Sequence, residues 1–209
     1  MRETQSIQNS LAFFQKWTSQ HAPSVVFRPP AKPAAIENFR KKTGLNLPEE
    51  LNQTLLIADG ETRSSAGMIG NWRLMSINEI QAAWGLLGQL VEKGAFSDQI
   101  PEKSPYIRQT WWHSSWIPVS TNDTGDCFCI DTDPPDLQRA GQVLLYLHHQ
   151  PQRALIASSL SAWFDRIARD LADGLYTFDP YEGFNYEGFM KSALEGKHLL
   201  DGLEGKLVT

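Results

Sequence analysis

The sequence predicts an α+β domain: an antiparallel sheet of about five strands with helices packed on one face, plus an N-terminal helix and a C-terminal tail. Three observations predict it. Apolar residues recur at helical spacing before residue 60 and after residue 158, period-two alternation begins at Met68, and four short strand-like runs follow Trp116. The order helices, strand, helix, strands, helix is typical of segregated layers rather than of βαβ units.

Residues 1–30 are predicted to form an amphipathic helix and a proline-rich linker. Apolar residues recur at helical spacing at Ile7, Leu11, Phe14 and Trp17. Prolines then recur between residues 21 and 33, and they cannot continue a helix because each lacks a backbone donor.

The main domain is predicted over residues 31–174 and begins with two helices. The first runs from about residue 34 to residue 43, with Gly44 as its stop. The second begins at Pro48, whose fixed φ suits a first helical turn, and ends at the Asp-Gly pair of residues 59–60.

A strand is predicted from Met68 to Met75, where residue character alternates with period two. Ser76 and Glu79 then have the spacing of a capping box, so a helix should begin there and close at Gly94. The predicted apolar face of this helix consists of Ile80, Trp84, Leu87 and Val91.

The aromatic stretch of residues 101–115 predicts no element. Four short strands joined by polar or proline-containing turns are predicted beyond it, as in an antiparallel meander: Trp116–Ser120, Cys127–Asp131, Gln142–Leu147 and Arg153–Ala157. A helix capped by Ser159 follows and ends at Gly174.

The Gly-rich tail of residues 175–209 differs in composition and contains YEGF twice. Helical spacing predicts a short helix packed on the domain, with Tyr186, Phe189, Met190, Ala193 and Leu194 on one face. A tail that binds a partner is the alternative.

The composition is that of an ordinary soluble protein, with 41% hydrophobic and 21% charged residues. The N-terminus does not resemble a secretion signal, and no window holds the roughly 20 apolar residues of a membrane span. We therefore expect a cytoplasmic protein without membrane contact.

A net charge of −5 argues against a nucleic-acid partner, because binding phosphates requires clustered Lys and Arg.

The distribution of charge points to a basic partner. Between Gln109 and Gln138 there is no Lys, Arg or Glu, but there are five aspartates: Asp123, Asp126, Asp131, Asp133 and Asp136. Without these five, the 24 acidic residues become 19 and equal the 19 basic ones. The formal charge excess therefore lies in one segment, which could attract a basic protein.

No metal and no cofactor are predicted. The chain has two cysteines, Cys127 and Cys129, which are expected to be free thiols on a strand because a disulfide at this spacing would be strained. Structural zinc needs four N or S ligands, and the adjacent His148 and His149 are expected to point to opposite faces of a strand. A loosely bound calcium at Asp131 and Asp133 is the alternative.

No catalytic motif is present: the chain lacks a phosphate-binding glycine loop, a nucleophile elbow and a zinc-protease helix signature. The sequence therefore predicts that the protein is not an enzyme. Trp111, Trp112 and Trp116 form a cluster, which is either core packing or a binding surface.

The chain resembles the SUKH superfamily, which includes fungal regulators of cell-wall assembly and glucan synthesis and is abundant in bacteria. The resemblance spans roughly residues 34–174 and rests on "IENFRKKTGLNLPEELNQTLLIADG", "WIPVSTNDTGDCFCIDTDP", "GQVLLYLHH" and "IASSLSAWFDRIARDL" in this order. The positions that match its pattern are expected to determine the fold: Trp116, Pro118, Gly125, Asp126, Asp131, Asp133, Pro134, Gly141 and Val143.

The resemblance implies an α+β domain that binds proteins, since bacterial members are largely immunity proteins that neutralise toxins, often nucleases. We expect the same role here, with a toxin domain as the protein partner. Acidic and aromatic residues are the expected contact surface: Asp123, Asp126, Asp133, Asp136, Trp111 and Trp112. The alternatives are a scaffold related to cell-wall or envelope assembly and, less favoured, a hydrolase acting on glycans or nucleic acids.

Overall fold

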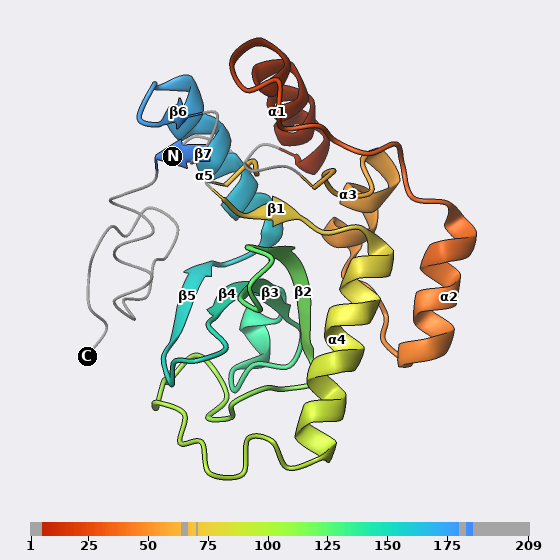
Figure 1. Ribbon diagram of the computed structural model, residues 1–209, viewed down its shortest axis with the longest axis vertical. Helices are drawn as coiled ribbons and strands as arrows, with labels where there is room; N and C mark the ends of the chain where they lie inside the picture. The colour runs from red at the N-terminus through yellow and green to blue at the C-terminus, as the bar shows by residue number, and fades with distance from the viewer. Residues whose placement is uncertain (1–5, 64–66, 70, 180–182, 186–209) are drawn as a thin grey trace.

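The computed structural model describes residues 6–63, 67–69, 71–179 and 183–185. In this part of the chain a five-stranded antiparallel sheet is combined with five α-helices and a separate hairpin (Figure 1), which confirms the predicted α+β class. The helices are α1 (Ile7–His21), α2 (Pro33–Thr43), α3 (Glu49–Ile57), α4 (Ile77–Glu92) and α5 (Leu160–Ala172). The strands are β1 (Arg73–Leu74), β2 (Trp116–Thr121), β3 (Cys127–Asp131), β4 (Gln142–Tyr146), β5 (Arg153–Ala157), β6 (Thr177–Asp179) and β7 (Gly183–Asn185).

Local signals in the sequence fix where most helices begin and end. Ser76 accepts a hydrogen bond from the amide of Glu79, and the Glu79 side chain bonds back to Ser76, so the predicted capping box is confirmed. Ser159 caps α5 as expected. Gly44 follows α2 with φ of 70°, a conformation that glycine adopts without strain.

The sheet has the order β1-β2-β3-β4-β5, and every neighbouring pair is antiparallel, as in the predicted meander. A short 3-10 helix, η1 (Leu137–Arg139), lies between β3 and β4. The β6–β7 hairpin is a finding that the sequence did not predict. The predicted helix of the tail lies outside the described residues.

The strand predicted from Met68 to Met75 is reduced to two residues, and the reason is the side chain of Glu61. The two oxygens of its carboxyl group accept the amides of Met68 and Leu74, each at 3.0 Å. Ile69 and Trp72 also bond to each other's backbone, so the segment folds back on itself instead of extending along the sheet. Only Arg73 and Leu74 pair with β2.

Both faces of the sheet are buried. On one face, Phe128, Ile130 and alternating residues of the neighbouring strands belong to the main core, to which all five α-helices also contribute buried residues. The first half of α4 and α5 lie against the sheet, and α1 and α3 pack on α5. On the other face, Cys127 and Cys129 lie in a second core that is covered by Leu87 of α4 and by the loop of residues 94–115. Figure 1 shows this loop below the sheet, away from α1 and α5. The side chains of β3 alternate between the two cores, as the period of a strand requires.

Among the described residues, no helix combines the length and the apolar character that crossing a bilayer requires.

Candidate functional site

The segment of residues 116–136 forms β2, β3 and the turns on either side of β3. At the β2–β3 tip, the Asn122 side chain accepts the amides of Thr124 and Asp126 at 3.0 and 3.3 Å. Asp123 and Gly125 have positive φ angles of 61° and 109°. Asp and Gly tolerate these left-handed conformations, which explains why these residue types stand in the turn.

The five aspartates of this segment do not form one surface. Asp123 and Asp126 lie at the β2–β3 tip, whereas Asp131, Asp133 and Asp136 lie at the other end of β3. Five strand residues separate the two groups by about 13 to 16 Å, at about 3.3 Å per residue. The acidic residues of the expected contact surface therefore lie in two groups, one at each end of β3.

Asp123 belongs to an ion-pair network rather than to a free negative surface. Arg73, which β1 places opposite Thr121, donates two hydrogen bonds of 2.8 and 2.7 Å to the carboxylate of Asp123. Arg73 also lies 3.0 Å from Glu79. The hydrogen bond from Arg73 lowers the pKa of Asp123 below its usual value and keeps the carboxylate ionised.

Two further arginines complete the network. Arg28 lies 3.0 Å from Glu79, and Arg63 lies 3.7 Å from Asp123 and 3.9 Å from Glu79. The network thus joins three guanidinium groups to two carboxylates, so its formal charge is positive. A basic partner would not be attracted to this group.

The aspartates at the other end of β3 are also paired. Asp133 receives a 2.6 Å hydrogen bond from Arg108, and Asp136 lies 3.7 Å from Arg139 and caps η1. Asp131 is fully buried, and burial raises the pKa of its carboxyl group. Gln142 donates to it at 3.2 Å. Calcium would have to displace these donors, so the structure does not favour the calcium alternative.

The cysteines are free thiols, as predicted, and both are buried. Burial raises the pKa of Cys127 to about 12 and that of Cys129 well above its usual value. A thiol with such a pKa is neither a nucleophile nor a metal ligand near neutral pH. These side chains therefore serve the second core.

Trp111 and Trp112 are also part of the second core, with 7% and 4% of their surface exposed. Trp112 makes edge contacts with Trp116 and Tyr146, at ring separations of 5.8 and 5.2 Å. These two residues are therefore mainly core residues and not an exposed aromatic surface, although both also line the cavity described next. They are buried because β3 and β4 present a second apolar face, which the loop must cover.

A cavity of about 330 Å³ lies between the end of α4 and this loop. Its lining contains no ionisable side chain and consists of Val91, Gly94, Phe96, Ser97, Gln99, Pro101, Gln109, Thr110, Trp111 and Trp112. Val91, which was expected on the buried face of α4, is 46% exposed, and Ile100, between two lining residues, is 81% exposed. Sequence reasoning missed the cavity because an irregular loop with no periodic pattern forms one of its walls.

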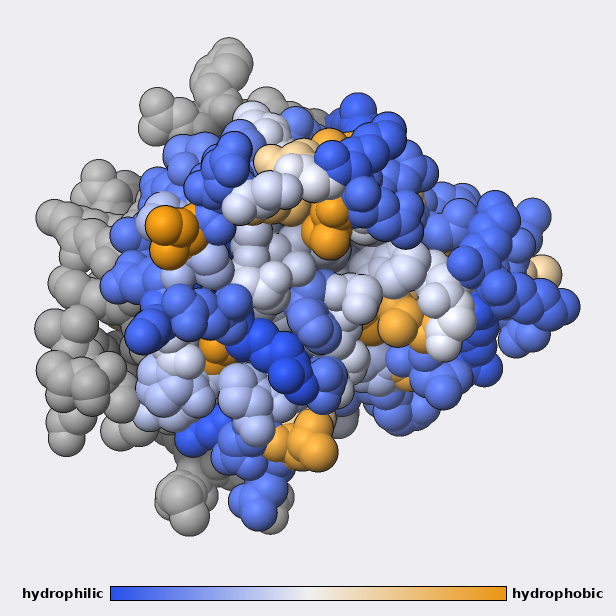
Figure 2. All heavy atoms as spheres, turned by 90° about the horizontal axis from the view of Figure 1, so that it is seen from below, coloured by the Kyte–Doolittle hydropathy of each residue, from blue (hydrophilic) through white to orange (hydrophobic). Residues whose placement is uncertain are grey.

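Figure 2 views the molecule from below, the side on which this loop lies in Figure 1. Hydrophobic residues appear on this face as separate spots among pale and blue residues, and not as one continuous patch. Apolar residues scattered singly over a surface are ordinary in folded proteins, so this face has no large apolar patch of the kind found at permanent interfaces.

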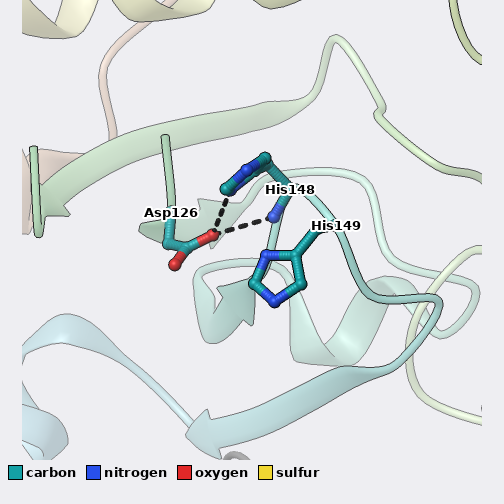
Figure 3. Close-up of side chains that lie close together, drawn as sticks. All are labelled: Asp126, His148 and His149. Carbon is teal, nitrogen blue, oxygen red and sulfur yellow. Dashed lines mark hydrogen bonds and ion pairs between the residues drawn. The ribbon is translucent and has the colours of Figure 1, made fainter. Parts of the chain in front are cut away.

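The structure also brings together Asp126, His148 and His149 (Figure 3), whose ligand atoms lie within 4.8 Å of one another. The expectation that the two histidines point to opposite faces of a strand is wrong. β4 ends at Tyr146, so both histidines lie in the following turn, and their rings are 4.8 Å apart. Carboxylate and imidazole groups in this arrangement are able to hold a metal ion.

Comparison with known proteins supports the resemblance found in the sequence. A sequence model of the SMI1 / KNR4 family (SUKH-1) matches residues 30–166. The chain is 23% identical to the cell wall biosynthesis/cell cycle regulator smi1 of Schizosaccharomyces pombe over 70% of its length and 32% of that protein. It is 22% identical to KNR4/SMI1 homolog 1 of Debaryomyces hansenii over 93% of its length and 55% of that protein. The chain thus spans between about a third and about half of the length of these relatives.

Proposed function

We propose that this chain, which belongs to the SMI1/KNR4 family (SUKH-1), is a non-enzymatic protein-binding regulator whose partner docks at the cavity beside α4. One observation carries the proposal: the cavity is lined by aromatic, aliphatic and neutral polar residues and by no ionisable group. Acid–base catalysis needs a titratable side chain within reach of the substrate. A cavity of this composition is suited to receiving an apolar side chain of a protein.

The exposed residues around the cavity support a protein as the ligand. Val91 and Ile100 place apolar surface at its rim, and the neutral side chains of Ser97, Gln99 and Gln109 offer hydrogen bonds beside it. An apolar centre with a polar surround is the usual anatomy of a specific protein interface.

We place this regulator in the control of cell-wall or envelope synthesis, because the Schizosaccharomyces pombe relative is named a cell wall biosynthesis/cell cycle regulator. The proposal concerns the domain that this chain shares with them. Nothing in it depends on regions of the relatives that the chain does not span.

Immunity against a toxin stays a prediction that rests on the family resemblance. Its electrostatic argument is weaker than the sequence implied, because the carboxylates of Asp123, Asp133 and Asp136 have arginine partners. A toxin encoded beside this gene, bound by the purified chain and inhibited by it, would favour immunity over the regulator.

The experiment is a photo-crosslinking comparison on the full chain. A crosslinking amino acid at position 100 should capture one protein, and the same amino acid at position 56 should not. Leu56 is a matched control because it is an exposed apolar residue, at 43%, on α3. Val91→Asp together with Ile100→Asp should weaken binding of the captured protein about 10-fold or more, because each substitution places a charge where the partner would cover apolar surface.

Binding that survives both aspartate substitutions would contradict the cavity as the docking site. Turnover of a glycan or nucleic acid that is lost when one carboxylate is replaced would contradict the non-enzymatic role.

Deletion of the tail tests whether the tail contributes to partner binding, and the deletion should begin after Asn185. Tyr176 and Phe178 pack against the main core, so an earlier deletion would disturb the fold.

A further inference from the structure

We propose that Asp126, His148 and His149 form a binding site for a divalent transition-metal ion, with zinc as the best fit. The antiparallel register of β3 and β4 brings these residues together. Cys127 lies opposite Tyr146, so the residue before β3 is held beside the turn that follows β4. Both histidines are in this turn, where the alternation of strand side chains no longer applies.

The carboxylate of Asp126 is fixed in position by three hydrogen bonds. Its Oδ1 accepts the backbone amide of His148 at 2.9 Å and lies 2.7 Å from Nδ1 of the same residue. Its Oδ2 accepts the side-chain amide of Asn122 at 2.9 Å. The contacts from the His148 amide and from Asn122 are outer contacts of the kind that orient the ligands of metal sites before the ion arrives.

The ligand set selects the kind of metal. Two imidazoles and one carboxylate suit zinc, copper or nickel, whereas calcium and magnesium prefer oxygen ligands alone. Three protein ligands leave a fourth position of a tetrahedral ion for water or for a side chain of a partner. The proposed site therefore keeps one coordination position of the metal open.

The geometry needs one local adjustment. Ligand atoms on a tetrahedral zinc ion lie roughly 3.4 Å apart, given bond lengths of about 2.0 to 2.1 Å. The three ligand atoms now lie within 4.8 Å of one another, and both histidines are exposed, so rotation of the rings suffices. The proton shared by His148 and Asp126 would leave to solvent if Nδ1 binds the ion.

A purely structural role explains only part of this cluster. The bonds between Asp126 and His148 tie the β2–β3 tip to the β4–β5 turn without any metal. They do not account for the position of His149, whose ring nitrogen has a contact of 3.4 Å with Gln150. As Figure 3 shows, both imidazole rings lie beside the same carboxylate.

The test is titration of the chelator-treated full chain with Zn²⁺ in a calorimeter, repeated with Co²⁺ as a spectroscopic probe. We expect one ion per chain and a visible Co²⁺ spectrum of nitrogen and oxygen ligation. His149→Ala should weaken binding by at least about 10- to 100-fold, because losing even an outer contact of a metal ligand costs that much, and the fold should be unchanged because this side chain is exposed. Asp126→Asn should have the same effect, and His21→Ala on α1 serves as the control.

Equal binding by the wild type and both site variants would overturn the proposal. Absence of binding by the wild type would overturn it as well. A thiolate band in the Co²⁺ spectrum would place the ion on Cys127 instead and would also contradict it. None of these outcomes depends on the partner, so the metal site stands or falls separately from the proposed function.

Discussion

Arg73 donates hydrogen bonds of 2.8 and 2.7 Å to the two carboxylate oxygens of Asp123, which lies fifty residues later in the chain. Only 3% of the arginine side chain is exposed, against 41% of the aspartate. The pair links the short β1 strand to the β2–β3 tip. It also neutralises a carboxylate that, in the sequence, seemed available to a partner.

Replacement of Asp123 by Asn should destabilise the fold by about 1 to 2 kcal/mol. Loss of one member of a buried pair costs about 3 to 5 kcal/mol, but Asp123 is partly solvated and Glu79 still faces Arg73. Asn tolerates the positive φ at this position, so the change removes charge without backbone strain. Chemical unfolding would measure it. Asp136→Asn is the control and should cost less than about 0.5 kcal/mol, so an equal loss in both variants would contradict the assignment.

Glu61 makes stability depend on pH. Burial raises the pKa of this carboxyl group from 4.5 to about 8, even though hydrogen bonds from Leu74 and Met68 and the charge of Arg73 act in the opposite direction. The folded chain therefore holds this proton more tightly than the unfolded chain does. The Glu61 contribution to the free energy of unfolding is fully present below pH 4.5 and falls as the pH rises toward 8.

Urea unfolding of the wild type and of Glu61→Gln across this pH range would check the effect. The variant should be less stable at acidic pH, because its amide nitrogen faces a backbone N–H. The wild type should lose stability relative to the variant as the pH rises. Parallel profiles for the two proteins would show that Glu61 does not titrate in this range.

The two cysteines should not react with thiol reagents in the folded protein. Both are buried in the second core, and their raised pKa values keep them protonated near neutral pH. Labelling with a disulfide reagent at mildly alkaline pH should be slow in the native state and rapid after unfolding. Fast native labelling would mean that the loop of residues 94–115 opens readily and exposes this core.

Gly60 should be far less tolerant of substitution than Gly44, although both have φ near 70°. A Cβ atom at residue 60 would lie 2.5 Å from the backbone carbon of Met75, whereas a Cβ at residue 44 would meet nothing within 4 Å. Gly44→Ala should cost about 1 to 2 kcal/mol from the left-handed conformation alone. Gly60→Ala should cost about 3 kcal/mol or more, because strain and a backbone clash add. Thermal unfolding distinguishes the two, and equal losses would contradict this explanation.

The parts of the fold that depend on neighbours in sequence were predictable. The Ser76–Glu79 capping box, the Ser159 cap and the strand alternation around Phe128 are local patterns, and each appears where the sequence placed it. The strand at Met68–Met75 was overestimated because Glu61, which takes two of its amides, has no signal within that segment.

The candidate site was less predictable, because it depends on contacts between distant residues. The sequence marked Asp123, but it could not indicate that Arg73 lies opposite it. β4 ends at Tyr146, one residue before the predicted end at Leu147, so His148 and His149 lie in a turn, where the two rings converge instead of pointing to opposite faces. Recognition of the proposed metal site from the sequence thus depended on where β4 ends, and no sequence motif marks that point.

The double-sided burial of the sheet separates folding from recognition. The main core depends on residues of all five α-helices, whereas the cavity depends on the end of α4 and on the loop that covers the opposite face. Under the proposed function, changes in loop length or in the residues at the rim would alter which protein binds, while the main core would continue to specify the chain's architecture. Residues 94–110 would then be the segment to exchange when a new specificity is engineered.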